Sequence, residues 1–261
     1  MRICHGSGAE SLHRVAVGDS YRHFLDGDGH GQSGCRDNGW RKWNWSGNRG
    51  AFAERGFDVV VSGRNSDKLD AVAGEVRAMG ANCEPIVADI AKSGDAEDLV
   101  TKTVMVFGRL DVLVNNAGNA VLSDVADMDI RAFDTMLAVN AAGPTYTSKY
   151  ALNAMKKNGG GTIVNISSMA AADPFPGLGA YGATKAYVNL LTKALATEGK
   201  PHGIRAFCVG PGAVETEMLR SSFPDFPADQ TLPTKAIADM VVLMTNPACQ
   251  YSSGQTIYVS K

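Results

Sequence analysis

From residue 51 onwards, short apolar runs alternate with longer amphipathic stretches. The apolar runs predict strands at 58–63, 83–90, 110–118, 161–168, 204–212 and 254–260. The amphipathic stretches predict helices at 66–79, 94–107, 128–155, 181–199 and 234–246. Alternating strands and helices indicate right-handed βαβ units and a parallel sheet, and continuous apolar strands predict burial on both faces. We therefore expect a single α/β domain over residues 50–261, with a doubly wound, Rossmann-like parallel sheet.

Residues 1–49 do not follow this alternation. They are rich in Gly, Ser, Asp and His and show neither a period of 2 nor one of 3.6. Taken alone, such a segment is typical of a disordered tail. It also contains all three tryptophans of the chain, Trp40, Trp43 and Trp45, directly before the regular pattern begins.

Composition narrows the function classes. A formal net charge of −2 gives no indication of nucleic-acid or anionic-membrane binding. No run of about 18 apolar residues is present, so we expect no membrane span. The run "RVAVG" (14–18) is too short for a signal peptide, which favours a cytoplasmic protein. The five cysteines form no CxxC pair and the N-terminal histidines lack ligand spacing, so we expect reduced thiols and no metal.

"YGATK" places Tyr181 and Lys185 four residues apart, and on a helix both would lie on one face. A nearby ammonium stabilises a phenolate and lowers the tyrosine pKa, which makes a tyrosine usable as a general acid or base. Taken alone the pair is weak, because such pairs are common on exposed helix faces.

Other polar motifs fall at the carboxyl ends of predicted strands. Ser168 ends one strand, "NNAG" (115–118) ends another, and "PG" (211–212) ends a third, with Thr216 just beyond. Ligands of open α/β sheets bind outside the carboxyl ends of the strands. These motifs and the Tyr-Lys pair therefore predict one shared site.

The motifs "NNAG", "LAVNAAG", "ISS", "YGATK" and "PGAVET" resemble those of short-chain dehydrogenases/reductases, in particular 3-oxoacyl-carrier-protein reductase-like members. The resemblance covers residues 51–258. It implies that Tyr181 is the catalytic acid/base and that Lys185 tunes it and holds the nicotinamide ribose. It also implies that Ser168 positions the substrate carbonyl and stabilises oxyanion charge, and that Asn140 supports a proton-relay water.

The same resemblance implies further cofactor contacts. Tyr181 and Lys185 would touch the cofactor, Asn115 and Gly118 would lie beside the adenosine ribose, and Asp89 would lie near the adenine. The segment that contacts the nicotinamide carboxamide would contain Pro211, Gly212 and Thr216. The implied partners are a small carbonyl or alcohol substrate and further copies of the chain in a homo-oligomer, although the ending Val259-Ser260-Lys261 departs from the family pattern and weakens a tetramer through the last strand.

The choice between NADP and NAD depends on the residues after the second strand. An acidic residue there would bond the ribose 2′-hydroxyl of NAD, whereas an arginine accommodates a 2′-phosphate. Here Ser62 and Arg64 follow the strand and no carboxylate occurs before Asp67, which favours NADPH over NADH. The alternative is that Arg64 is a solvated loop residue.

The substrate is barely specified. Residues 219–231 fall where the family carries a substrate loop. Phe223 and Phe226 either line the mouth of the site or cap the core, and the sequence does not favour one.

The family pattern also requires a first strand followed by Thr-Gly-x-x-x-Gly-Ile-Gly, whose glycines let the backbone approach a pyrophosphate at a helix N-terminus. The printed chain lacks this motif. Tryptophan has the single codon TGG, so a reading one base out of frame turns Trp40, Trp43 and Trp45 into glycines. Positions 38–45 can then read Thr-Gly-Gly-x-Ser-Gly-Ile-Gly.

We therefore predict that residues 1–49 are a frame error in the gene or its recorded sequence, and that the printed chain has lost its first strand and glycine-rich loop. The favoured function is oxidoreduction between NADP(H) and a carbonyl or secondary alcohol. The alternative is an inactive or non-enzymatic protein of the same fold, because the phosphate loop is lost.

Overall fold

The computed structural model describes residues 14–18 and 50–261. Within them, seven strands form one sheet in the order β3-β2-β1-β4-β5-β6-β7, and every neighbouring pair is parallel. The strands are β1 (Arg14–Gly18), β2 (Asp58–Gly63), β3 (Cys83–Val87), β4 (Val112–Asn115), β5 (Gly161–Ile166), β6 (Ile204–Pro211) and β7 (Thr256–Val259). The order reverses between β1 and β4, so the crevice expected for a ligand lies at that point of the sheet.

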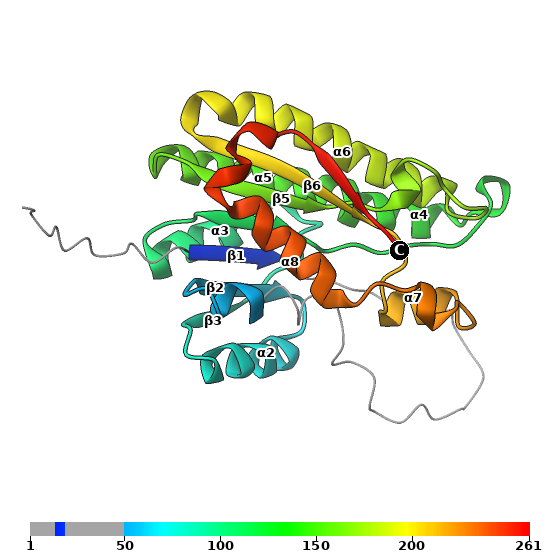
Figure 1. Cartoon of the computed structure of the whole chain (residues 1–261), viewed down its shortest axis with the longest axis horizontal. Coiled ribbons are helices and arrows are strands. Elements are labelled where there is room, and N and C mark those ends of the chain that lie inside the picture. The colour runs from blue at the N-terminus through cyan, green and yellow to red at the C-terminus, as the bar shows by residue number, and fades with distance from the viewer. Residues whose placement is uncertain (1–13, 19–49) are drawn as a thin grey trace, which may run out of the picture.

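Helices cover both faces of the sheet, as predicted (Figure 1). The α-helices are α2 (Ser66–Ala78), α3 (Ser93–Phe107), α4 (Ile130–Leu137), α5 (Gly143–Lys157), α6 (Gly179–Gly199), α7 (Glu217–Ser222) and α8 (Thr234–Thr245). Shorter helical turns are η1 (Val125–Asp127), η2 (Ala138–Ala142), η3 (Met169–Ala171), η4 (Lys200–His202), η5 (Ala228–Gln230) and η6 (Pro247–Ser252). No helix of the described segments is long and apolar enough to cross a membrane.

The prediction of an uninterrupted helix over 128–155 is wrong. The segment divides into α4, the π-helical turn η2 and α5. Pro144, at the start of α5, has no N–H to donate to the preceding turn, so the regular α-helical ladder is interrupted there.

The prediction that the printed chain lacks a first strand is also wrong. Residues 14–18, the short run "RVAVG", form β1 between β2 and β4 (Figure 1). Buried backbone groups of two neighbouring strands each need a partner, and a five-residue extended run supplies partners to both. Residues 1–13 and 19–49 lie outside the described residues, so the domain boundary at 49/50 and the frame-error interpretation remain predictions.

Alternation along each strand separates two cores. Val59 and Val61 belong to the cluster that includes residues of α2 and α8, whereas Val60 belongs to the cluster that includes residues of α3, α5 and α6. All three valines are fully buried. Burial of successive side chains on opposite faces is what a sheet covered by helices on both sides requires.

Candidate active site

A cavity of about 730 Å³ opens at the carboxyl edge of the sheet. Most of the predicted site residues line it, and they come from four separate segments of the chain. These are Gly118 after β4, Ser168 after β5, Tyr181 and Lys185 on α6, and Pro211, Gly212 and Thr216 at the end of β6 and the start of α7. The predicted convergence of motifs on one edge is therefore present in the structure.

Lys185 is almost completely buried beside Tyr181. Its Nζ donates a hydrogen bond to the carbonyl oxygen of Ile166 at 3.0 Å and lies 5.8 Å from the centre of the Tyr181 ring. Burial lowers the pKa of Lys185 to about 8, and the charge of the nearby Cys208 opposes that shift. The cavity wall therefore holds Tyr181 and, beside it, Lys185, whose ammonium group binds its proton less tightly than an ordinary lysine does.

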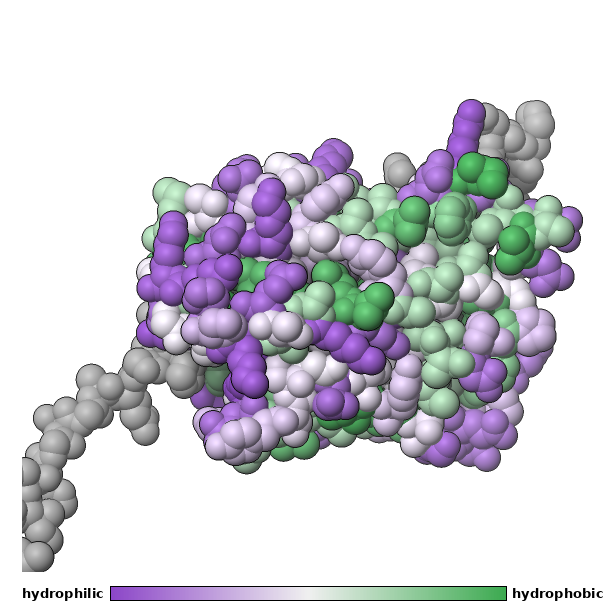
Figure 2. Space-filling model, turned by 90° about the horizontal axis from the view of Figure 1, so that it is seen from above, coloured by the Kyte–Doolittle hydropathy of each residue, from purple (hydrophilic) through white to green (hydrophobic). Residues whose placement is uncertain are grey.

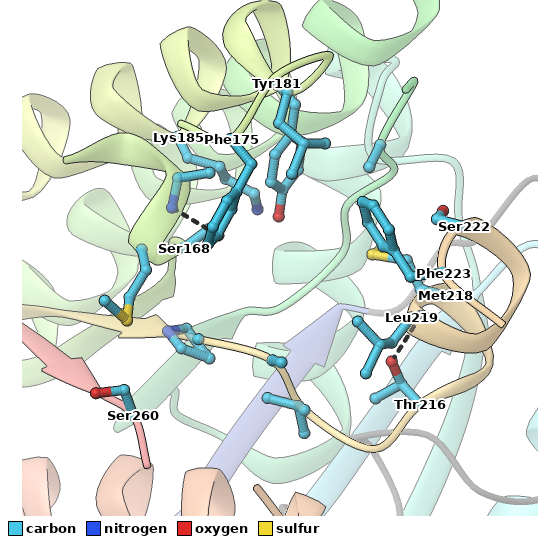
Figure 3. Close-up of a pocket in the computed structure, with 18 of the residues that line it drawn as sticks. Ser168, Phe175, Tyr181, Lys185, Thr216, Met218, Leu219, Ser222, Phe223 and Ser260 are labelled. Carbon is cyan, nitrogen blue, oxygen red and sulfur yellow. Dashed lines mark hydrogen bonds between the residues drawn. The ribbon is translucent and has the colours of Figure 1, made fainter. Parts of the chain in front are cut away.

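Ser168 lies two residues after β5, has an extended backbone and caps the turn η3. Its Oγ accepts a hydrogen bond from the Ala170 N–H at 3.2 Å, which orients the side chain and leaves the hydroxyl proton for another acceptor. Figure 3 shows Ser168 and Tyr181 pointing into the same space beside Lys185. A carbonyl oxygen in that space would meet two hydroxyl donors.

Asn140 is fully buried in η2 and does not line the cavity. Its Nδ2 donates to the Asn119 carbonyl at 2.8 Å and to Thr184 Oγ1 at 3.0 Å, and its Oδ1 accepts from the Asn119 N–H at 2.9 Å. Thr184 in turn donates to the Tyr181 carbonyl at 2.8 Å. The Asn140 amide thus joins the turn after β4 to the helix that carries Tyr181.

Gly118 lies where any larger residue would meet this network. A Cβ at Gly118 would be 3.1 Å from Lys185 Nζ and 3.3 Å from Asn140 Oδ1. Asn115, by contrast, lies outside the cavity. Its side chain bonds Thr147 at 2.6 Å, Asn165 at 2.8 Å and Ser148 at 3.1 Å, so it ties β4 to β5 and α5.

Arg64 and Asp89 follow β2 and β3 and also lie outside the cavity. Both are half-buried, and Asp89 Oδ1 accepts from the Ala91 N–H at 3.3 Å. Among the described residues, none forms an ion pair with Arg64. These two positions extend the row of polar residues along the carboxyl edge beyond the cavity.

Several buried polar atoms at this edge have no hydrogen-bond partner among the described residues. They are both amide atoms of Asn116, Ser62 Oγ and Asn119 Oδ1. An unpaired buried polar atom costs about 1–3 kcal/mol, so a polar ligand that supplied partners would be stabilised here. The row from Ser62 and Arg64 to Asn116 fits the polar atoms of a nicotinamide dinucleotide. The sequence reasoning missed Asn116, although "NNAG" contains it.

The segment after β6 is held by its neighbours. The Gly212 N–H donates to the Val259 carbonyl at 2.8 Å, and Thr216 Oγ1 accepts from the Leu219 N–H at 3.2 Å, which caps α7. Phe223 and Phe226 both line the cavity. The alternative left open by the sequence is thus decided in favour of the mouth of the site.

Comparisons with known proteins agree with this arrangement. The family model for short chain dehydrogenases matches residues 50–226, beginning where the regular alternation begins. A protein of Thermotoga maritima described as an uncharacterized oxidoreductase is 40% identical over 181 residues, which is 69% of this chain and 71% of that protein. Human dehydrogenase/reductase SDR family member 4 is 30% identical over 219 residues, 80% of this chain and 79% of that protein.

Among solved structures, a 3-ketoacyl-(acyl-carrier-protein) reductase from Brucella melitensis complexed with NADH superimposes with a TM-score of 0.79. It is 26% identical, and the match covers 95% of this chain and 96% of that one. A short-chain type dehydrogenase/reductase from Mycobacterium marinum gives a TM-score of 0.81 at 26% identity over 95% and 94% of the two chains. The chain therefore belongs to the short chain dehydrogenase family of oxidoreductases.

Proposed function

We propose that this protein reduces a small carbonyl compound at the expense of NADPH, or catalyses the reverse oxidation of a secondary alcohol, with Tyr181 as the general acid and base. The observation that supports this most strongly is the buried Lys185 ammonium held beside the Tyr181 ring, with the Ser168 hydroxyl at the same cavity wall. The family membership supplies the reaction class.

A nicotinamide dinucleotide, when bound, supplies or accepts the hydride at the substrate carbon. In the reducing direction the Tyr181 hydroxyl gives its proton to the substrate oxygen, and in the oxidising direction it takes that proton back. The positive charge of Lys185 favours the phenolate that remains after the proton has left. Ser168 donates a hydrogen bond to the same substrate oxygen and stabilises the charge that develops there.

The chain's own residues offer a place for each end of the cofactor. Asn116, Pro211, Gly212 and Thr216 line the cavity and would hold the nicotinamide end. Arg64, with Ser62 beside it, would pair with a 2′-phosphate, which favours NADPH. Among solved structures of this fold, the Brucella protein is complexed with NADH and a gluconate 5-dehydrogenase of Burkholderia cenocepacia is in complex with NADP, so these structures favour neither cofactor.

We also infer that the protein assembles with copies of itself. Large apolar side chains stand exposed on α3 and α6, where Met105 is 77% and Leu190 is 69% exposed. Light scattering on the purified chain tests this, and a monomer at micromolar concentration would contradict it.

The acid/base role is tested by Tyr181→Phe, with Tyr187→Phe on the same helix as the matched control. General acid catalysis typically contributes about 10²–10⁴-fold, so kcat of Tyr181→Phe should fall by about that factor. The Kd for NADPH should stay within about threefold, because only one hydroxyl is removed. Unchanged turnover in Tyr181→Phe would show that another group moves the proton.

A further inference from the structure

The mouth of the cavity is lined mainly by apolar side chains. On the side of α6 it is formed by Phe175 and Leu178, and on the side of α7 it is formed by Met218, Leu219, Phe223 and Phe226. We call these six residues the apolar mouth. Figure 3 shows Phe175 beside Tyr181 and Lys185, and Phe223, Met218 and Leu219 across the cavity from them. A substrate whose oxygen meets Ser168 and Tyr181 must place the rest of its body between these two walls.

Phe175 is 68% exposed although it lines the cavity. A large aromatic side chain that is open to water on one side loses that exposure when an apolar body lies against it, and the buried area is favourable. Figure 2, which shares the horizontal axis of Figure 1, shows hydrophobic residues gathered towards the right-hand end, the end that carries α7 in Figure 1. The apolar character therefore extends from the cavity to the surface around it.

The charged groups at the mouth do not favour an acidic substrate, because two aspartates and one lysine stand there and Lys185 lies at the catalytic end. The charged lining residues of the described chain are Asp173, Lys185, Asp229 and Lys261. Lys185 Nζ is bonded to the Ile166 carbonyl at the catalytic end, and Lys261 Nζ donates to the Asp229 carbonyl at 2.5 Å. The two aspartates would repel a carboxylate or phosphate that entered the mouth.

The guanidinium of Arg220, on α7, is engaged with its neighbours, and Arg220 lies outside the lining. Arg220 pairs with Glu215 through two hydrogen bonds of 2.8 and 2.5 Å and donates a third to the Phe226 carbonyl at 2.5 Å. Thr231 donates to the same carboxylate at 3.1 Å. Arg220 thus holds the segment 215–231 together and leaves its apolar side chains, rather than its charge, to face the cavity.

We propose that the substrate is a neutral carbonyl compound with an extended apolar body, of the class of medium-chain alkyl or aryl ketones, and that the apolar mouth selects it against acidic carbonyl compounds. This rests on the proposed function, which it makes more specific. The carbonyl carbon gains a hydride with its two electrons from the reduced nicotinamide dinucleotide, which is oxidised. The carbonyl oxygen gains the Tyr181 proton, Tyr181 is reprotonated from water, and the product is the secondary alcohol.

The first experiment measures kcat/KM of the full-length protein with NADPH for 2-butanone, 2-heptanone and 2-nonanone, and for 8-oxononanoate, the methyl ketone of the same length whose far end is a carboxylate. Each buried methylene should raise kcat/KM by about two- to fourfold. The oxo acid should be at least about tenfold poorer than 2-nonanone, because its carboxylate would enter a mainly apolar mouth whose two aspartates outnumber its one lysine. Equal values along the ketone series, or a preference for the oxo acid, would overturn the proposal.

Variants locate the effect in the mouth. Phe223→Ala should flatten the increase along the ketone series, and Leu219→Arg should raise the value for 8-oxononanoate relative to 2-nonanone by supplying a cation. Tyr251→Ala is the matched control, since Tyr251 is a 92% exposed aromatic residue outside the lining. An increase along the series that is as steep in Phe223→Ala as in the unmodified protein would show that another surface binds the chain of the ketone.

A binding measurement separates this proposal from the proposed function. Calorimetric titration of the full-length chain with 2-nonanone and with 8-oxononanoate needs no turnover. If no ketone is reduced but 2-nonanone binds and Phe223→Ala weakens that binding, the proposed function fails and the apolar specificity stands. If ketones are reduced in a Tyr181-dependent way but the oxo acid binds as tightly as 2-nonanone, the proposed function stands and the apolar specificity fails.

Discussion

The side chain of Lys185 lies at the proposed catalytic site, and its burial carries an electrostatic cost. The spacing of "YGATK" predicted that Tyr181 and Lys185 share a helix face, and the structure confirms this. The burial of Lys185 and its bond to Ile166 were not predictable, because Ile166 ends β5 and reaches the lysine only through the packing of α6 on the sheet. The spacing thus predicts that the two side chains lie on one helix face, whereas the packing of the fold determines the pKa of Lys185.

The lowered pKa of Lys185 predicts how stability depends on pH. The unfolded chain binds the lysine proton up to about pH 10.5, and the folded chain releases it near 8. The unfolded state therefore binds more protons between these values, and the free energy of unfolding should rise by up to about 3 kcal/mol from pH 8 to 10.5. Below pH 8 the full cost of the buried charge is present.

Urea denaturation at pH 7.5 and pH 9.5 measures this, with Lys185→Met as the comparison. In Lys185→Met the free energy of unfolding should not show the rise with pH that Lys185 causes. At pH 7.5 the turnover of this variant should be strongly reduced, because no ammonium remains to stabilise the phenolate. The same pH slope in both proteins would show that Lys185 is not the group responsible.

At Arg64 we expect the choice of cofactor to be made. Arg64→Asp removes the partner of a 2′-phosphate and adds a repelling charge, so the ratio of kcat/KM for NADPH to that for NADH should fall by about 10–10³-fold. The same ratio for Arg64→Ala should lie between that of the unmodified protein and that of Arg64→Asp, because alanine removes the attraction to the phosphate without adding a repelling charge. Steady-state kinetics with both cofactors measure the ratio, and a ratio that is the same in all three proteins identifies Arg64 as a surface residue.

Asparagines show where reasoning from motifs reaches its limit. Asn115 was expected beside a ribose, but its amide ties together β4, β5 and α5. Asn116, one residue later, has the unpaired amide in the cavity lining. Neighbouring residues of an extended segment point to opposite sides, so the register of β4, which ends at Asn115, decides which asparagine faces the fold and which faces the cavity. A motif alone does not provide that register.

At the scale of elements, the π-helical turn η2 is where the helical pattern of the sequence was misleading. Hydrophobic periodicity continues through 128–155 and predicts one helix, yet the bonds of Asn140 to Asn119 and Thr184 are tertiary and leave no trace in that periodicity. Such turns interrupt α-helices frequently at functional sites. Here the turn connects the segment after β4 to α6.

Asn140→Ala should therefore affect more than one element. It removes three hydrogen bonds inside the fold and leaves the Asn119 backbone N–H and C=O without these partners, which should cost about 2–4 kcal/mol of stability. Thermal or urea denaturation measures the loss, and Asn189→Ala on α6 serves as a control from a half-exposed site. Because Asn140 acts by positioning, Asn140→Asp should retain part of the turnover, and full stability in Asn140→Ala would refute the network.

At the scale of the whole molecule, the alternation of strands and helices was sufficient to predict a doubly wound sheet covered on both faces. The position of the first strand was not predictable, because "RVAVG" is short and stands within an aperiodic segment. Backbone pairing with the two neighbouring strands places it in the sheet. Val15 is in register with Val59 on one side and with Val112 on the other, so the backbone partners come from residues more than 40 positions away.

The presence of β1 changes how we expect a chain with residues 1–49 as printed to fold. A sheet without its first strand would leave one edge of β2 and one edge of β4 without backbone partners and would destabilise the chain, but β1 completes the sheet, so loss of folding no longer follows. The consequence that remains concerns the cofactor. The family's glycine-rich loop, which brings backbone N–H groups to the pyrophosphate, is missing from the printed text, and tryptophans stand at the positions where the shifted frame has glycines.

We therefore predict that the printed chain binds NADPH weakly and that a chain with the frame restored over residues 30–49 binds it at least about tenfold more tightly, since each charged hydrogen bond regained contributes about 1.5–3 kcal/mol. NADPH fluorescence titration of both chains measures the ratio.

The two chains also differ in a property that does not depend on folding. All three tryptophans lie in the shifted segment, so the restored chain has none. The absorbance and the intact mass of the natural protein therefore show which of the two reading frames it carries. Tryptophan absorbance in that protein, together with micromolar NADPH binding by the printed chain, would establish residues 1–49 as a genuine N-terminus. A tryptophan-free natural protein, with binding only by the restored chain, would establish the frame error and explain why the alternative of an inactive relative arises from the printed sequence alone.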